Sequence, residues 1–237
     1  MCRMFGYVGD SREDLERLVE GLCMSARKDT VAASLGMDTV HADGWGYALY
    51  SDSGLSVRKS RRPVFEDDVD LPPTDGRIYA IFHARMATDK KMVESRFSHP
   101  YCGDDESSFV FLAHNGSVDK GRLQQKVGFS GRATDSELAM KYLLRFGLGR
   151  ASELERYTTP NSALNLMVLS VGRNGGARVL VKHFYNKVDG RKDKSRYYAI
   201  YHERLSGGKA AFSSTFNDYG FSGTELKRPG LLSVSGL

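Results

Sequence analysis

Cysteine is scarce in this sequence, and long apolar runs are missing. The 237 residues contain three cysteines, Cys2, Cys23 and Cys102, an odd number without a CxxC pair. This argues against a disulfide framework and against a cysteine-rich zinc site. No stretch approaches the roughly 20 apolar residues of a membrane-spanning helix, and no apolar segment precedes a cleavage site near the N-terminus. We therefore expect a cytoplasmic protein without a membrane anchor.

The rest of the composition is that of an ordinary folded protein. Hydrophobic residues make up 41% of the chain and charged residues 27%, and 34 basic against 29 acidic side chains leave a formal charge of +5. This apolar content can fill a core, which excludes disordered, collagen-like and coiled-coil chains. Because we find no internal repeat, low-complexity tract or clear linker, we expect residues 2–237 to form a single domain.

The hydrophobic pattern predicts strands first, then helices, then strands again. Ser11 followed by acidic residues is typical of a helix start, and apolar residues from Leu15 to Ala26 recur at helical spacing. Two further helices are predicted over Asp119–Val127 and Thr134–Phe146. Strands are predicted over Arg3–Gly9, Gly46–Tyr50, Leu55–Lys59, Arg77–His83, Phe109–Ala113, Ala163–Val171, Ala177–Tyr185, Arg196–Tyr201, Ala210–Ser213 and Leu231–Val234. This order favours an α+β fold with mainly antiparallel sheets and helices packed against them.

Cys2 is the first candidate for chemistry, because it directly follows the initiator methionine. If Met1 is removed, the residue carries both a thiol and a free α-amine. Near pH 7–8 much of such an amine is neutral and can accept the thiol proton, so one residue supplies nucleophile and base. The alternative is an incidental cysteine at a frayed terminus.

Three more polar positions stand at the ends of predicted elements. Arg85 follows a strand and offers a planar fork for a carboxylate, or it forms a surface ion pair. Asn115 and Gly116 offer a side-chain amide and an open backbone N–H that suit an oxyanion hole, although Asn-Gly is also a common hairpin turn. Asp135 opens a helix, either as a cap or as an acceptor for a substrate ammonium. Together these groups are the parts needed to cleave the side-chain amide of a free amino acid such as glutamine.

With these motifs the sequence resembles the class II glutamine amidotransferases, which are N-terminal-nucleophile (Ntn) hydrolases. The matching segments occur in family order from Cys2 to Phe146: Cys2-Arg3-Met4-Phe5-Gly6-Tyr7-Val8-Gly9, Asp43-Gly44-Trp45-Gly46, His83-Ala84-Arg85-Met86-Ala87-Thr88, Ser98-His99-Pro100, His114-Asn115-Gly116 and Thr134-Asp135-Ser136-Glu137. The resemblance implies a four-layer αββα sandwich.

The resemblance also implies a role for each matching residue. Cys2 would be the nucleophile, and Asn115 with Gly116 the oxyanion hole. Arg85 would bind the α-carboxylate of glutamine and Asp135 its α-ammonium, while Thr88 helps to shape the pocket. Two positions depart from the pattern of many synthase-linked members, which carry glycine after the nucleophile and an aromatic residue after the arginine. Here these positions are Arg3 and Met86.

The remaining expectations concern partners and the other candidate residues. L-Glutamine or another γ-glutamyl compound is the expected substrate; the enzyme either passes ammonia to a separate synthase subunit or acts alone as a γ-glutamyl hydrolase. Basic runs over residues 58–62 and 187–196 leave nucleic-acid binding as an alternative of another class. The six histidines show no metal-ligand spacing, so neither a catalytic metal nor a cofactor is expected. We expect His83 and His114 to hold loops by hydrogen bonds, and Cys23 and Cys102 to be structural.

Overall fold

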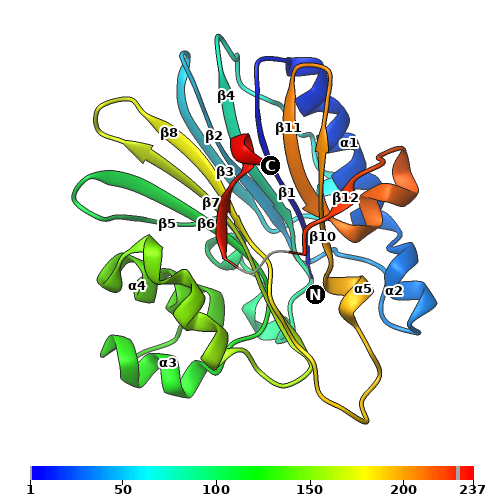
Figure 1. Cartoon of the computed structure of the whole chain (residues 1–237), viewed down its shortest axis with the longest axis vertical. Coiled ribbons are helices and arrows are strands. Elements are labelled where there is room, and N and C mark those ends of the chain that lie inside the picture. Colours follow the sequence, from blue (N-terminus) through cyan, green and yellow to red (C-terminus); the bar gives the residue numbers. More distant parts are fainter. Residues whose placement is uncertain (1, 228–229) are drawn as a thin grey trace.

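Two antiparallel sheets form the centre of the protein. The computed structural model describes residues 2–227 and 230–237 (Figure 1). The first sheet has the order β12 (Thr224–Glu225), β10 (Ile200–Arg204), β11 (Gly208–Ser213), β1 (Arg3–Gly9), β4 (Ile78–Ala84), β2 (Trp45–Ser51) and β3 (Gly54–Ser60). The second has the order β13 (Leu231–Ser233), β8 (Ala177–Lys182), β7 (Ser162–Gly172), β6 (Ser108–Gly116) and β5 (Tyr101–Asp104), and β9 (Tyr185–Asn186) also pairs with β7. The longest antiparallel pairing in the second sheet joins β6 to β7.

Helices cover the outer face of each sheet. The first sheet is covered by α1 (Arg12–Arg27), whose first turn is capped by Ser11, because its hydroxyl accepts a bond from the Asp14 N–H at 3.1 Å. The second sheet is covered by α3 (Lys120–Val127) and α4 (Asp135–Phe146). Two short helices, α2 (Thr30–Ser34) and α5 (Ser195–Tyr198), pack against each other at the edge of the first sheet (Figure 1).

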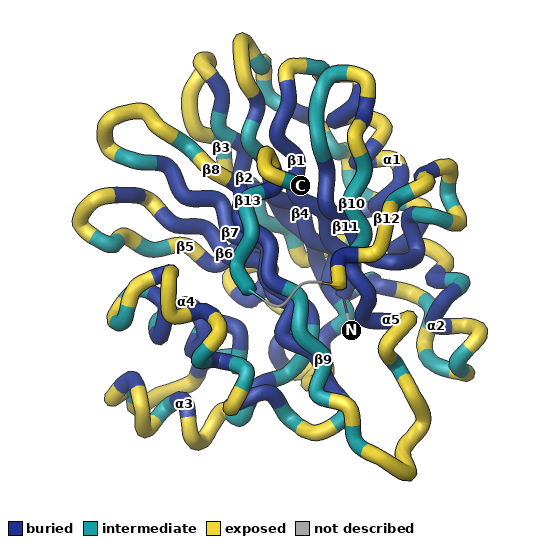
Figure 2. The backbone as a smooth tube through the Cα atoms, in the orientation of Figure 1, coloured by how far each residue is buried: buried dark blue, intermediate teal, exposed yellow. Residues whose placement is uncertain are grey.

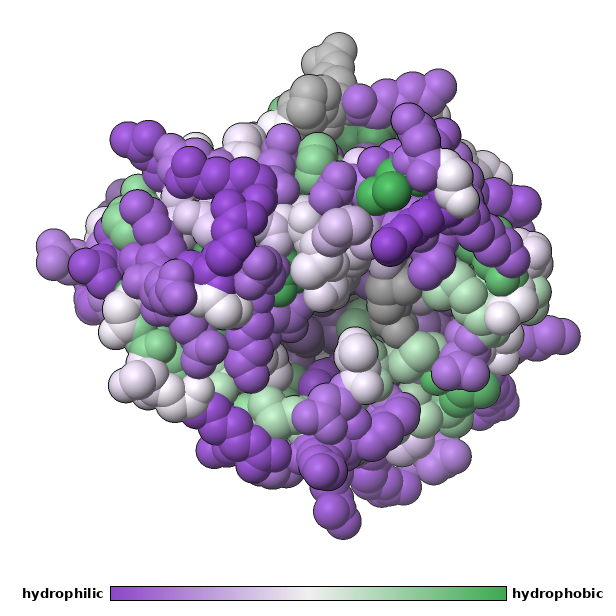
Figure 3. Space-filling model, turned by 90° about the horizontal axis from the view of Figure 1, so that it is seen from below, coloured by the Kyte–Doolittle hydropathy of each residue, from purple (hydrophilic) through white to green (hydrophobic). Residues whose placement is uncertain are grey.

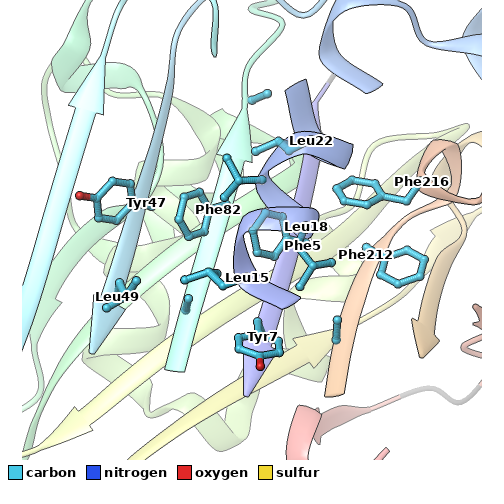
Figure 4. Close-up of a cluster of buried hydrophobic side chains, with 14 of the residues drawn as sticks. Phe5, Tyr7, Leu15, Leu18, Leu22, Tyr47, Leu49, Phe82, Phe212 and Phe216 are labelled. Carbon is cyan, nitrogen blue, oxygen red and sulfur yellow. The ribbon is translucent and has the colours of Figure 1, made fainter. Parts of the chain in front are cut away.

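Strand β1 illustrates how the side chains divide between layers. Successive side chains of a strand point to opposite faces. Phe5 and Tyr7 belong to the core under α1, where the Phe5 and Phe82 rings stack with centroids 4.8 Å apart (Figure 4). Met4 and Val8 belong to a second core between the two sheets. A third core joins the second sheet to α3 and α4, and Figure 2 shows the middle strands of both sheets buried. The layers are thus αββα, and the predicted α+β fold with two antiparallel sheets is confirmed.

Several predicted elements differ in detail. The predicted strand Arg196–Tyr201 is wrong in its first half: the chain forms α5 over Ser195–Tyr198, and strand β10 begins only at Ile200. Helical turning lets Tyr197 and Tyr198 both face the interior, where the Tyr198 ring stacks on Tyr185 with centroids 5.6 Å apart. The predicted strand Ala177–Tyr185 ends at Lys182.

The short helix α2 and the edge strands β5 and β12 had no counterpart in the sequence-based prediction. Cys102 lies in β5, where Tyr101 points inward and Cys102 outward, so this cysteine is exposed rather than structural. Cys23 packs against the core under α1 as a partly buried residue. Among the described residues, no helix combines the length and apolar character needed to cross a bilayer.

Candidate active site

A single pocket brings most of the predicted site residues together. It encloses about 270 Å³ and is lined by Cys2, Arg85, Thr88, Gly116 and Asp135, among others. Cys2 is buried at the start of β1. Figure 1 places the N-terminus at the lower end of the sandwich, and the view from below in Figure 3 shows a hollow in this face.

Antiparallel pairing explains why distant segments meet here. Arg3 at the start of β1 lies opposite Ala84 at the end of β4, so the chain leaves β4 at Arg85 directly beside Cys2. In the other sheet, β6 ends at Gly116 close to the same point, and α4 begins at Asp135. The site therefore stands where the ends of three strands and one helix converge.

Asn115 contacts Cys2 directly. The Cys2 backbone nitrogen donates to Oδ1 of Asn115 at 3.1 Å, which fixes the orientation of the amide. Within residues 2–227 and 230–237, Nδ2 of Asn115 is buried and has no hydrogen-bond partner. A buried donor without a partner costs free energy. Asn115 is not among the described residues that line the pocket, and it joins the site through its contact with Cys2.

Gly116 adds a position that only glycine fits. Its φ is +140°, and a Cβ atom built there would lie 1.8 Å from the carbonyl oxygen of Ala163. Asn115 and Gly116 are the last two residues of β6 and pair with Asn165 and Leu164 of β7. The alternative of a hairpin turn at this Asn-Gly pair is therefore wrong.

Arg85 is buried and lies on the wall of the pocket. Its Nη1 donates to the carbonyl oxygen of Met92 at 2.7 Å, and none of the ion pairs among the described residues involves its guanidinium. The alternative that Arg85 forms a surface ion pair is therefore wrong. Thr88, three residues further on, is exposed at the pocket's rim.

Asp135 is the first residue of α4, and Thr134 is the cap. The Thr134 hydroxyl accepts from the Glu137 N–H at 3.0 Å. The Asp135 carboxylate accepts from the backbone N–H groups of Val118 at 3.1 Å and Ser136 at 3.0 Å, and it lines the pocket. A carboxylate can accept about four hydrogen bonds, so capacity remains for a cationic group in the pocket.

Three buried histidines lie together at the inner side of the pocket, and two of them, His99 and His114, line it. His83 Nε2 donates to the His114 carbonyl oxygen at 3.2 Å, and His114 Nδ1 lies 2.9 Å from the Ser136 hydroxyl. These hydrogen bonds are made as predicted, but from within β4 and β6 rather than from loops. The His83 and His99 rings lie with centroids 4.0 Å apart, and burial holds the pKa of both imidazoles well below the usual value. These two imidazoles are therefore uncharged near neutral pH.

Sequence reasoning gave no site role to some residues that the structure brings to the pocket. His99 and Lys120 both line it. The Ser98-His99-Pro100 motif could have indicated His99, whereas no motif in the sequence indicated Lys120. Among the described residues there is no group of three or more His, Cys, Asp or Glu side chains placed to hold a metal ion.

Arg3 reaches away from the pocket into a buried ion network. Its Nη2 lies 2.5 Å from Asp29 Oδ2, and its Nη1 donates to the carbonyl oxygens of Cys2 and Tyr197, both at 3.3 Å. Burial alone would raise the pKa of Asp29, but the Arg3 guanidinium and His41 outweigh it and hold that pKa well below its usual range. This network fixes the backbone on the inner side of Cys2.

Structural comparison defines the class of fold. A structure of glutamine phosphoribosylpyrophosphate amidotransferase from B. subtilis, complexed with ADP and GMP, superposes with a TM-score of 0.66 at 17% identity, over 98% of this chain and 48% of that one. A structure described as the allosteric regulatory enzyme of purine biosynthesis gives the same TM-score, identity and coverage. The chain thus spans about half the length of these structures, and it shares the Ntn-hydrolase amidotransferase fold.

The sequence comparison then gives the family. The family model "Glutamine amidotransferases class-II" matches residues 1–182. The chain belongs to this family, which confirms the family and the enzyme class, a cysteine-dependent amidohydrolase, predicted from the motifs. No match was found among curated proteins.

Proposed function

We propose that the chain hydrolyses the side-chain amide of glutamine through a thioester on Cys2. The observation that carries this proposal is the pairing of Cys2 with Asn115. One end of the Asn115 amide accepts from the Cys2 nitrogen, while its Nδ2, which has no partner in the described part of the chain, is left for an oxyanion. Residues 2–237 would form the one catalytic domain that carries this site.

The chemistry begins with a processed N-terminus. Loss of Met1 frees the Cys2 amine, which takes the thiol proton directly or through water. Sulfur attacks the amide carbonyl, and the negative charge on its oxygen is stabilised by Asn115 Nδ2 and the Gly116 N–H. The C–N bond then breaks, the amine returns its proton to the leaving nitrogen, and ammonia departs. Water attacks the remaining γ-glutamyl thioester, giving glutamate and the free thiol.

Three other residues would select the amino acid. Arg85 binds the α-carboxylate with its guanidinium, Asp135 binds the α-ammonium, and Thr88 shapes the rim. Two observations support this assignment. All three residues line the same pocket, and the Asp135 carboxylate can accept further hydrogen bonds. Two opposite charges at fixed positions favour a zwitterionic substrate over a simple amide.

The fate of the ammonia separates two versions of this function. In the first, a separate synthase subunit receives it; in the second, the enzyme acts alone on glutamine or another γ-glutamyl compound. Turnover of glutamine that rises when a co-purifying subunit and its acceptor are added supports the first version. Turnover of γ-glutamyl peptides by the isolated chain supports the second.

Nucleic-acid binding gains no support from the position of the basic runs. Arg58 and Arg62 both lie 3.5 Å from the Asp67 carboxylate, and Lys187 pairs with Asp193 at 3.0 Å. These charges are partly compensated within the chain.

The test compares Cys2→Ala with the matched control Cys102→Ala. Intact mass establishes whether Met1 is removed, and glutamate release is measured with glutamine as substrate. We expect no turnover above background for Cys2→Ala and wild-type turnover for Cys102→Ala, because Cys102 is exposed on β5. Unchanged activity in Cys2→Ala contradicts the thioester, and an active protein that keeps Met1 contradicts the amine as base.

A further inference from the structure

The loop that carries two of the proposed substrate contacts has little regular structure of its own. We call residues 85–92 the arginine loop, because it begins with Arg85 and also contains Thr88. Its only regular piece is a single 3₁₀ turn over Lys90–Met92, in which Asp89 accepts from the Lys91 N–H at 2.9 Å. Apart from the bond of the Arg85 guanidinium to the Met92 carbonyl oxygen, contacts from outside the loop must therefore hold Arg85 and Thr88 in place.

Arg132 holds the far end of the loop, because its Nη2 donates to the Lys91 carbonyl oxygen at 2.8 Å, and the segment around Thr88 is held by Asp43. Asp43 lies just before β2, is buried, and is not among the described residues that line the pocket. Its carboxylate oxygen Oδ2 accepts from the Ala87 N–H at 2.7 Å and forms an ion pair with the Lys90 ammonium. One carboxylate thus contacts the loop at two points, on either side of Thr88.

The backbone around Asp43 completes the attachment. The Asp43 N–H donates to the Arg85 carbonyl oxygen at 2.9 Å, and the Arg85 N–H donates to the Gly44 carbonyl oxygen at 2.8 Å. Gly44 has φ of +109°, and a Cβ atom there would lie 2.6 Å from the Ser60 carbonyl oxygen. Residue 44 therefore has to be glycine for the chain to pass this close.

We propose that Asp43 is the positioning residue of the arginine loop, which it holds so that Arg85 and Thr88 face the substrate pocket. This inference rests on the proposed function of that pocket. Asp43 itself is not one of the described residues on the pocket lining, so it acts through the loop on substrate capture and not on the thioester chemistry.

The carboxylate suits this role better than a neutral group. The Ala87 N–H is buried, so losing its acceptor leaves an unsatisfied donor. Asparagine keeps an oxygen for Ala87 but loses the charge that attracts Lys90. The Lys90 side chain is 70% exposed, so its ion pair is the weaker of the two contacts. Asp43→Ala should therefore perturb the loop most, Asp43→Asn less, and Lys90→Met least.

A matched control exists at the other end of β1. Asp14 is also buried, and its carboxylate also accepts from a backbone N–H, that of Gly207, at 2.7 Å. Gly207 directly precedes Gly208, which pairs with Gly9, and Gly9 lies seven residues and roughly 20 Å along β1 from Cys2. Asp14→Ala thus removes a similar hydrogen bond without touching the arginine loop.

The first measurement is glutamine turnover as a function of substrate concentration, with the melting temperature recorded for each variant. We expect Asp43→Ala to raise KM at least about tenfold while kcat stays within about threefold, since a displaced Arg85 weakens capture and leaves Cys2 in place. Asp43→Asn should give an intermediate KM, and it also serves if Asp43→Ala fails to fold. Asp14→Ala should lower the melting temperature and leave KM unchanged.

The second measurement reads the loop without turnover, by labelling of the Cys2 thiol. A glutamine analogue with an electrophilic γ carbon needs the amino-acid contacts, whereas iodoacetamide needs only an accessible thiol. In Asp43→Ala the analogue should react at least about tenfold more slowly than with wild type, and iodoacetamide at the wild-type rate. If wild type is active and Asp43→Ala has the same KM and the same labelling rates as wild type, the positioning role of Asp43 is overturned and the proposed function is not. A wild type that neither turns over glutamine nor prefers the analogue overturns the proposed function, and this inference with it.

Discussion

Replacing Asn115 by alanine tests the oxyanion hole more directly than any other change. The substitution removes both the Nδ2 donor, which has no partner among the described residues, and the Oδ1 acceptor for the Cys2 nitrogen. Removal of one oxyanion-hole donor typically lowers kcat about 10²–10³-fold, or about 2.7–4 kcal/mol. We expect a loss of this size in kcat and a smaller change in KM.

The same contacts predict a small effect on stability. Leaving the buried Cys2 N–H without its acceptor costs about 1–3 kcal/mol, whereas removing a buried donor without a partner regains about 1–3 kcal/mol. These contributions oppose each other, so the free energy of unfolding should change by no more than about 2 kcal/mol. An inactive variant with a near wild-type unfolding curve is therefore the expected result.

The assay combines steady-state glutamate release with thermal or denaturant unfolding. Asn115→Asp is the companion variant, because it keeps an oxygen acceptor for the Cys2 nitrogen and replaces the donor with a carboxylate oxygen. That oxygen repels a developing oxyanion, so the loss of kcat should be at least as large. The reasoning is refuted by an Asn115→Ala enzyme whose kcat lies within about threefold of wild type.

Three further predictions follow from the site and its surroundings. Gly116→Ala should destabilise the fold by about 2–5 kcal/mol, since it combines a strained positive φ with overlap against the Ala163 carbonyl oxygen; the free energy of unfolding in urea checks this. Arg85→Lys should raise KM for glutamine about 10–100-fold with kcat nearly retained, because a lysine cannot reproduce the planar fork; substrate-saturation curves test it, and an unchanged KM excludes Arg85 as the residue that binds the α-carboxylate. Burial lowers the pKa of His41 and of His183 to about 4. Because the unfolded chain binds these protons near pH 6.5, stability should be full above that pH and fall as the pH drops from about 6.5 towards 4; melting temperatures across this range measure the slope, and a flat profile contradicts it.

Local patterns were enough to predict much of the fold. The strand Arg3–Gly9 is found with the predicted bounds, and Asp119 and Thr134 prove to be the caps of α3 and α4. These features depend on neighbours in the sequence, such as a cap accepting from a residue three positions on. The strand error at residues 196–198 has a tertiary cause, because burial of Tyr197 and Tyr198 against α2 decides the local conformation.

The sequence motifs indicated which candidate site residues lie together, but not the network of contacts around them. The motifs indicated Cys2, Asn115 and Asp135, and these residues do converge. The sequence contains no sign that Arg3 pairs with Asp29, 26 positions along the chain, or that Asp43 contacts Lys90, 47 positions along. Such contacts depend on which strands become neighbours, and single-sequence periodicity does not carry that information.

The two departures from the pattern of synthase-linked relatives now have different meanings. Cys2 and Arg3 are adjacent, but consecutive side chains of a strand point to opposite faces. Met86 lines the pocket, whereas Arg3 is not among the described residues that do so. Arg3 is fully buried against Asp29 and over the Tyr197 ring, 4.1 Å from its centroid. A change at Arg3 therefore acts on the position and stability of β1, whereas a change at Met86 alters the surface that a substrate meets. The choice between glutamine and a larger γ-glutamyl compound should thus depend on Met86 and the loop that Asp43 holds.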